Sequence, residues 1–355
     1  VHDLFQTNYF CKGISLSMHM NFWNELPRPA FTLAPMEDVT DTVFREIVLS
    51  VSEPDCLHVI FSEFTSTDGL CHEVGGPKVK HRLFINESEK RLLREKNVRI
   101  VAQIWGTRPE KFREATRIIC SEGHFDGIDI NMGCPVKKIV KQGGCSALIG
   151  QPTLAKEIIH ATKEASDIPV SVKTRIGIDR VVTEEWIGAL LETEPAVITI
   201  HGRTQKQQSE GRADWNEVAR AVNIRNGMGS STLIHGNGDV YSIKQGIERA
   251  ADSGAEGVMI GRGIFHDPWF FNRSPEDPEP EERLRLLWKH AALFTRTWKD
   301  EKNFAILKRF FKIYTSGFHG SARIRARLME SGSLDEVKRV LNECDYPVAA
   351  DTDVT

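Results

Sequence analysis

The sequence lacks clustered cysteines. Its seven cysteines are scattered over 355 residues, and no two of them are spaced as Cys-x-x-Cys. Structural zinc and iron–sulfur sites need closely spaced ligands, and small disulfide-rich domains need cysteines in regular pairs. The cysteine pattern therefore argues against a metal site and against a disulfide framework. It predicts a protein of the reducing cytoplasm.

Long hydrophobic runs and a bias toward one sign of charge are also missing. No apolar run in the sequence approaches the roughly 20 residues that span a bilayer. Residues 1–19 lack the continuous apolar core of a secretory signal. The net charge of −3 gives the chain as a whole no basic character. We therefore expect no membrane partner, and we expect residues 1–19 to form an ill-ordered extension.

What the sequence does contain is a regular alternation of short apolar runs and amphipathic helical patterns. The helical patterns include 109–123, 152–166, 183–193 and 242–254. Eight strand–helix units over roughly 240 residues match a (β/α)8 TIM barrel in number and size. A doubly wound open sheet is the alternative, but no GxGxxG sequence opens the first unit. Within a barrel domain at 20–272, we expect strands at 31–36, 58–64, 99–106, 127–134, 169–177, 196–204, 232–239 and 257–263.

The composition changes after the barrel. Residues 273–282 hold three prolines and five acidic residues, which is typical of a stiff linker. Between 281 and 330 the chain has 12 Lys or Arg and 5 Asp or Glu, although its overall charge is negative. We therefore predict a small basic helical domain at 283–346 and a disordered tail at 347–355.

Polar residues stand at or near the carboxyl ends of many expected strands, the edge of a TIM barrel that carries its chemistry. A lysine on an apolar strand, such as Lys173, needs either an acidic neighbour or an anionic cofactor as its partner. Gln103 and His201, taken alone, fit satisfied core residues. The polar and flanking residues at these strand ends are Pro35, Met36, Gln103, Asn131, Cys134, Lys173, Arg175, His201 and Arg203.

Two glycine-rich turns follow the last two expected strands. One is Asn237-Gly238-Asp239 and the other contains Gly261-Arg262. Glycine lets backbone N–H groups approach an anion closely, and the arginine adds positive charge. The same pair of strands carries the phosphate site of many TIM barrels. We therefore favour a phosphate-binding site over turns without a ligand.

The motifs between about residue 31 and residue 271 resemble those of a known enzyme family. They are "FTLAPMEDVTDTVFR", "IDINMGCPVKK", "SVKTRIG", "TIHGRTQKQQSEGRADW", "IHGNGDV" and "VMIGRG". They resemble the tRNA-dihydrouridine synthases, most closely the bacterial B-type branch. The resemblance implies FMN-dependent reduction of specific tRNA uridines to 5,6-dihydrouridine, with NADPH or NADH as the electron donor. It also implies that FMN is held by Pro35, Met36, Gln103, Lys173, His201, Asn237, Gly238, Asp239, Gly261 and Arg262.

The resemblance makes Cys134 the proton donor and places Asn131 and Arg175 near the uracil. Saturating the C5=C6 bond requires a hydride at C6 and a proton at C5. A carboxylic acid with a pKa of about 4 is ionised at neutral pH, whereas a thiol with a pKa of about 8.5 keeps its proton. Burial would hold that thiol neutral still more firmly. The alternative for Cys134 is a small buried apolar residue, and for Cys145 packing is the expected role.

The segment "NFAILKRFFKIYTSGF" resembles the helical RNA-binding part of the same family. In it we expect Lys308, Arg309 and Lys312 to contact tRNA phosphates, because a basic module beside an acidic barrel suits RNA. A solvated helix surface is the alternative. The basic run at 137–141 fits phosphate contacts and a solvated surface equally well.

Two other functions would explain part of the sequence. An FMN-dependent TIM-barrel oxidoreductase of a small-molecule enone or pyrimidine explains the barrel and the phosphate turns, but not the basic helical part. An RNA-binding protein with an inactive barrel would not need Cys134 and Lys173. No nicotinamide motif separates NADPH from NADH, and nothing in the sequence implies a stable protein partner.

Overall fold

Eight parallel strands form the centre of the molecule. The computed structural model describes residues 21–273 and 278–346. The sheet runs β2-β1-β9-β8-β7-β6-β5-β4, and β2 also pairs with β4, which closes the ring. The short β3 (Thr65–Ser66) only extends the ladder on β4. The barrel strands are β1 (Ala30–Leu33), β2 (Val59–Phe61), β4 (Arg99–Trp105), β5 (Gly127–Met132), β6 (Val170–Arg175), β7 (Val197–His201), β8 (Leu233–Asn237) and β9 (Gly257–Ile260).

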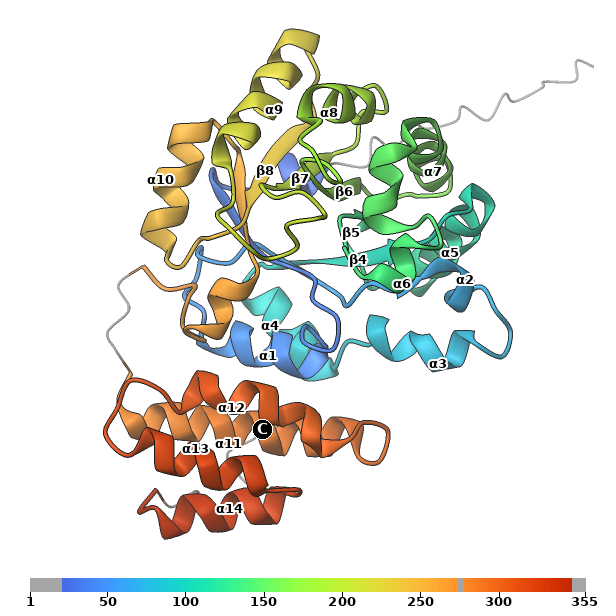
Figure 1. Ribbon diagram of the computed structural model, residues 1–355. Coiled ribbons are helices and arrows are strands. Elements are labelled where there is room, and N and C mark those ends of the chain that lie inside the picture. The colour runs from blue at the N-terminus through green and yellow to red at the C-terminus, as the bar shows by residue number, and fades with distance from the viewer. Residues whose placement is uncertain (1–20, 274–277, 347–355) are drawn as a thin grey trace, which may run out of the picture.

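Helices surround this ring, as Figure 1 shows. The predicted (β/α)8 TIM barrel is therefore confirmed, and the closed ring excludes the open doubly wound sheet. Each predicted strand is present but ends before its last predicted residue, because the strand-end turns belong to loops. The helices between strands are α1 (Thr42–Val51), α2 (Thr67–Leu70), α3 (Gly76–Lys80), α4 (Glu87–Glu95), α5 (Pro109–Glu122), α6 (Lys137–Val140), α7 (Pro152–Glu164), α8 (Thr183–Leu191), α9 (Trp215–Met228) and α10 (Ile243–Ser253).

Local sequence signals explain where the helices begin and end. Helix α5 begins at Pro109, which is suited to a first helical position because its missing N–H would have no partner there. It ends at Glu122 and is capped by Gly123, whose φ of 64° is the left-handed conformation that glycine adopts without strain. The Asp41 side chain caps α1 by accepting a hydrogen bond from the Phe44 N–H.

The strands alternate between two environments, because successive side chains point to opposite faces. On β5, Ile128 and Ile130 belong to the large apolar cluster that includes residues of the surrounding helices. Asp129 and Asn131 lie on the other face, and both are buried. Phe22 and Trp23 belong to the second apolar cluster, together with residues of several barrel strands. The polar residues of the strands are therefore gathered inside the barrel.

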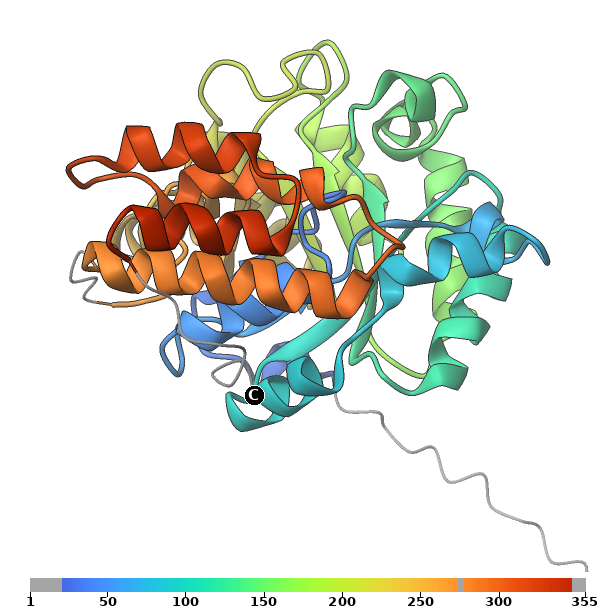
Figure 2. The same ribbon diagram turned by 90° about the horizontal axis from the view of Figure 1, so that it is seen from below.

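Four helices follow the barrel and pack beneath it, next to α1 in Figure 1 and in front of the barrel in Figure 2. The Phe44 ring of α1 stacks on Phe310, with centroids 4.9 Å apart. One apolar cluster includes residues of both parts, so barrel and helices share a core. The helices are α11 (Pro280–Trp298), α12 (Lys308–Tyr314), α13 (Ser321–Glu330) and α14 (Leu334–Glu343).

One predicted boundary differs from the observed one, and two predicted segments fall on residues that the structure does not describe. Helix α11 begins at Pro280, inside the segment 273–282 that the sequence predicts as a linker. The predicted extension at 1–19 and the predicted tail at 347–355 lie outside the described residues. Within 21–273 and 278–346, no helix is long and apolar enough to cross a membrane.

Candidate functional site at the barrel mouth

The pairing register of the strands determines which polar side chains become neighbours. Arg175 pairs with His201, and His201 pairs with Asn237, so these three residues of β6, β7 and β8 lie at one level. Lys173 pairs with Asn131 on the level below. Because all the strands are parallel, both levels lie near the carboxyl edge of the ring, where a TIM barrel carries its site.

A cavity of about 200 Å³ opens at this edge. It brings together nine of the ten residues predicted to hold the cofactor, and Arg175 also lines it. Gln103, Asn131 and Cys134 do not line it. Arg203, expected at a strand end but given no role, also lines it, and the lining residues Gln208 and Tyr241 were not predicted from the sequence. The nine predicted residues are Pro35, Met36, Lys173, His201, Asn237, Gly238, Asp239, Gly261 and Arg262.

Lys173 reaches this cavity from inside the barrel. Its Nζ donates a hydrogen bond to Asn237 Oδ1 at 3.3 Å, and Asn237 Nδ2 donates to the Met259 carbonyl at 2.7 Å. Burial lowers the pKa of Lys173 to about 8, with a smaller lowering by Arg175 and an opposing effect of Asp129. Lys173 thus carries its charge at neutral pH with an amide oxygen, not a carboxylate, as its hydrogen-bond acceptor. This arrangement suits an anionic ligand.

Arg203 organises the wall made by β7 and β8. Its Nη2 donates to both carboxylate oxygens of Asp239 at 2.7 Å, and its Nη1 lies 3.2 Å from His201 Nε2. The arginine can only donate, so His201 Nε2 accepts. Burial and the nearby cations lower the pKa of His201 well below its usual value, so the ring is neutral. The Asp239 carboxylate is therefore bonded within the protein and also accepts from the Ala213 N–H.

Both glycine turns line the cavity, and Gly261 leaves room in it. Gly238 has a φ of 121°, which only glycine adopts readily. Gly261 lacks such a constraint, and a Cβ placed there would meet nothing closer than the Ala34 Cβ at 3.8 Å. An added methyl group at 261 would therefore occupy cavity space. Arg262 lies 3.5 Å from Asp239 and is half exposed. The open glycine and the surrounding cations fit a phosphate group.

Cys134 lies just beyond β5 and is half buried. The Cys145 thiol donates a hydrogen bond to it, which lowers the pKa of Cys134 to about 7 against the opposing effect of burial. The Val136 N–H lowers this pKa further. Burial favours the neutral Cys134 thiol, as the sequence led us to expect, but these donors outweigh burial and lower the pKa. Cys145 is fully buried and, beyond packing, is the hydrogen-bond partner of Cys134.

Arg175, predicted to lie near the substrate, braces the loops around Cys134. Its Nε donates to the Gly133 carbonyl at 2.6 Å, and its Nη1 donates to the carbonyls of Thr204 and Gln208 at 3.1 and 2.8 Å. These bonds join the turn after β5 to the loop after β7. Arg175 also lines the cavity, so the same side chain connects these loops and forms part of the cavity wall.

The predicted RNA-binding residues of α12 lie apart from the cavity lining. Arg309 and Lys312 are exposed, and Lys308 is partly exposed. Arg309 Nη1 donates to the Asp38 carbonyl at 2.8 Å, which ties α12 to the loop after β1. In the run at 137–141, all three lysines are exposed at α6, directly after Cys134. Both basic segments are thus accessible, and none of their residues lines the cavity at the barrel mouth.

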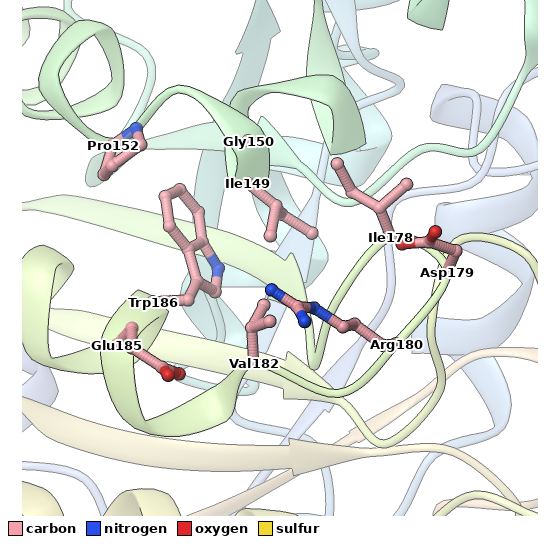
Figure 3. Close-up of a pocket in the computed structure, with 9 residues that line it drawn as sticks. All are labelled: Ile149, Gly150, Pro152, Ile178, Asp179, Arg180, Val182, Glu185 and Trp186. Atoms are coloured by element: carbon pink, nitrogen blue, oxygen red, sulfur yellow. The ribbon is translucent and has the colours of Figure 1, made fainter.

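A larger cavity of about 340 Å³ lies beside α8. Figure 3 shows Ile149, Trp186 and Arg180 around it. Its lining includes none of the predicted site residues, and the Trp186 Nε1 is already bonded to Thr174 Oγ1 at 2.9 Å. Size alone therefore does not locate the chemistry of this barrel. In the described parts of the chain, no group of three or more His, Cys, Asp or Glu side chains could hold a metal ion.

Comparisons with known proteins show the family and the fold to which this chain is similar. The dihydrouridine synthase family model matches residues 32–351. A probable tRNA-dihydrouridine synthase of Staphylococcus aureus strain COL is 43% identical over 339 residues, which are 95% of this chain and 99% of that protein. Probable tRNA-dihydrouridine synthase 2 of Bacillus subtilis is 42% identical over 92% of this chain and 97% of its own. Histamine dehydrogenase from Rhizobium sp. 4-9 shares the fold, with a TM-score of 0.51 and 13% identity over 68% of this chain and 44% of that chain.

Proposed function

Because the chain belongs to the dihydrouridine synthase family, we propose that it reduces uridines of tRNA to 5,6-dihydrouridine. In this proposal FMN is the cofactor, and NADPH or NADH is the electron donor. The observation that carries the proposal is the cationic, glycine-lined cavity at the barrel mouth, next to a loop that presents a thiol with a pKa of about 7.

The cavity residues divide the binding of FMN among themselves. Gly238, Gly261 and Arg262 would hold the phosphate, because they combine backbone access with positive charge. Pro35, Met36 and His201 would border the rest of the cofactor. Lys173 would place its charge where reduction makes the ring anionic. When bound and reduced, FMN supplies the hydride for C6 of uracil.

Cys134 would deliver the proton to C5 of uracil. A thiol with a pKa of about 7 is still half protonated at neutral pH, which suits a general acid. The thiolate left behind accepts hydrogen bonds from the Cys145 thiol and the Val136 N–H, so the charge that forms is already matched by donors. Arg175, bonded to the carbonyl of the neighbouring Gly133, adds a nearby positive charge.

The exposed basic segments would hold the RNA. A uridine inside folded tRNA must be unstacked to enter a barrel mouth, and this costs binding energy that contacts elsewhere must offset. Lys308, Arg309 and Lys312 on α12 and the lysines of 137–141 provide accessible charge for phosphate contacts. Asn131 would lie near the uracil, one level above Gln103 in the barrel.

Mapping of modified nucleosides in tRNA from cells that lack the protein tests this function. Specific dihydrouridines should disappear and should return when the wild-type gene is restored, but not when the Cys134→Ala gene is restored. The Cys134→Ala protein should still purify with FMN, which would show that the variant has lost the reaction and not the cofactor. Unchanged dihydrouridine at every tRNA position in the deletion strain would contradict the proposed function.

A further inference from the structure

A buried chain of hydrogen bonds begins at Asp129, a residue to which neither the sequence nor the family resemblance assigns a role. The register places Asp129 of β5 between Gln103 of β4 and Ser171 of β6. Ser171 Oγ donates to Asp129 Oδ1 at 2.6 Å, and Gln103 Nε2 donates to Asp129 Oδ2 at 2.7 Å. All three residues are at most 1% exposed. The carboxylate therefore has both oxygens bonded inside the barrel.

The chain continues from Gln103 to the backbone of Cys134. Asn131 Nδ2 donates to Gln103 Oε1 at 2.9 Å. Asn131 Oδ1 then accepts from the Gly133 N–H at 3.0 Å and from the Cys134 N–H at 2.9 Å. Two amide side chains thus connect a buried carboxylate to the turn that carries the thiol.

Donor and acceptor chemistry gives this chain one direction. An ionised carboxylate only accepts, so Gln103 must turn its NH2 group toward Asp129 and its oxygen toward Asn131. Asn131 must then turn its NH2 group toward Gln103 and its oxygen toward the backbone N–H groups, which only donate. The amide orientations that Asp129 requires are therefore the same ones that the backbone N–H of Cys134 requires.

We propose that Asp129 is a positioning residue, which holds the turn at Cys134 in place by fixing the amide orientations of Gln103 and Asn131. The inference deepens the proposed function, because the thiol held in this way is the proposed proton donor. It explains why a carboxyl group is buried inside the barrel, although an apolar side chain at the same position would avoid the cost of desolvation. Burial raises the pKa of Asp129 to about 6, against the effects of its two hydrogen bonds and of Lys173, so it is ionised at neutral pH.

Two substitutions at Asp129 separate direction from simple structural support. Asp129→Leu removes the acceptor at nearly constant size, so Gln103 loses the partner that fixes its orientation. Asp129→Asn is the matched control, because it keeps an acceptor at the same place. Its oxygen can face Gln103, while Ser171 can donate to the Ile128 carbonyl, now 3.5 Å away.

The readout is the alkylation of Cys134 by iodoacetamide across pH, followed on its peptide by mass spectrometry. In the wild type and in Asp129→Asn, the half-maximal rate should lie near pH 7, the pKa of Cys134. In Asp129→Leu the turn shifts and the thiol loses its donors, so the rate at neutral pH should fall by roughly tenfold as the pKa returns toward about 8.5. Asp129→Asn should stay within about twofold of the wild type, and dihydrouridine formation should follow the same order.

If Asp129→Leu does not fold, Gln103→Met, which cuts the chain between Asp129 and Asn131, takes its place in the comparison with Asp129→Asn. Equal alkylation of Cys134 in the chain-breaking variant and in Asp129→Asn would overturn the positioning role. If alkylation follows the expected order but the wild type forms no dihydrouridine, the positioning role stands and the proposed function fails.

Discussion

The thiol of Cys145 donates a hydrogen bond to the sulfur of Cys134, and this bond is the largest influence on the pKa of Cys134. Cys145 is fully buried, whereas Cys134 is half buried. Burial raises the pKa of Cys145 well above its usual value, so Cys145 keeps its proton and remains the donor. As pH rises, Cys134 therefore loses its proton before Cys145 does.

Cys145→Ala should shift the pH dependence of uridine reduction. The donor must be protonated, so activity should fall as pH rises through the Cys134 pKa of about 7. Without the Cys145 hydrogen bond that pKa rises, and the alkaline limb of kcat/KM should move to higher pH. Cys120→Ala, at a half-buried cysteine outside the site, is the control and should leave the limb in place. Coincident pH profiles for Cys145→Ala and wild type would contradict the role of the pair.

Lys173→Met should weaken FMN binding and remove its pH dependence near pH 8. The pKa of Lys173 is about 8, so the wild-type cavity loses this positive charge as pH rises through that value. Affinity for FMN, measured by quenching of flavin fluorescence, should therefore fall across pH 8 in the wild type and stay flat in Lys173→Met. Lys156→Met, whose lysine pairs with Glu192 at the surface, is the control. An unchanged pH dependence in Lys173→Met would show that another group is responsible.

Phe310→Ala should destabilise barrel and helices together. Phe310 is 3% exposed and stacks on Phe44 of α1, so its removal leaves a cavity between the two parts. Such truncations of a buried Phe cost about 3–5 kcal/mol. Urea unfolding followed by circular dichroism and by tryptophan fluorescence should show one earlier transition by both probes. Met329→Ala, at an exposed side chain, should change little. Two separate transitions would show that the shared core does not couple the parts.

Replacing Lys308, Arg309 and Lys312 with alanine should weaken tRNA binding in a salt-dependent way. Each lost phosphate contact should flatten the slope of log K against log[salt] by about 0.9 for duplex RNA or about 0.7 for single-stranded RNA. The measurement is tRNA affinity over a salt series for wild type and triple variant. A triple alanine variant at Lys137, Lys138 and Lys141 provides the comparison. An unchanged slope for the α12 variant would leave those residues as a solvated surface.

The alternation of side chains made much of this site predictable from sequence. Lys173 and Arg175 stand two residues apart on one strand, and a period of two puts both on the inner face. The same period places Arg203 two residues after His201, and both were expected near the end of their strand. The bonds from Arg203 Nη2 to both carboxylate oxygens of Asp239 could not be predicted, because that pairing depends on the conformation of two loops.

Long-range partners account for what the sequence did not reveal. The thiol contact of Cys145 depends on the fold of the loop between it and Cys134. In that fold Cys145 has a positive φ of 52°, which nothing in its residue type predicts. The shared core of α1 and α12 joins Phe44 to Phe310 across most of the chain. The composition at 273–282 suggested a separation between these parts, whereas α11 begins within that segment.

The most direct test of the central claim is the mass of tRNA incubated with the purified protein, FMN and NADPH. Unmodified tRNA transcripts should gain two hydrogen atoms at defined uridines, and fragment masses should locate them. Cys134→Ala should oxidise NADPH at the flavin as the wild type does, but uridine reduction should fall by about 10²–10⁴-fold, the usual contribution of a general acid. Oxidation of NADPH by the wild type with no change in the mass of any uridine would contradict the account.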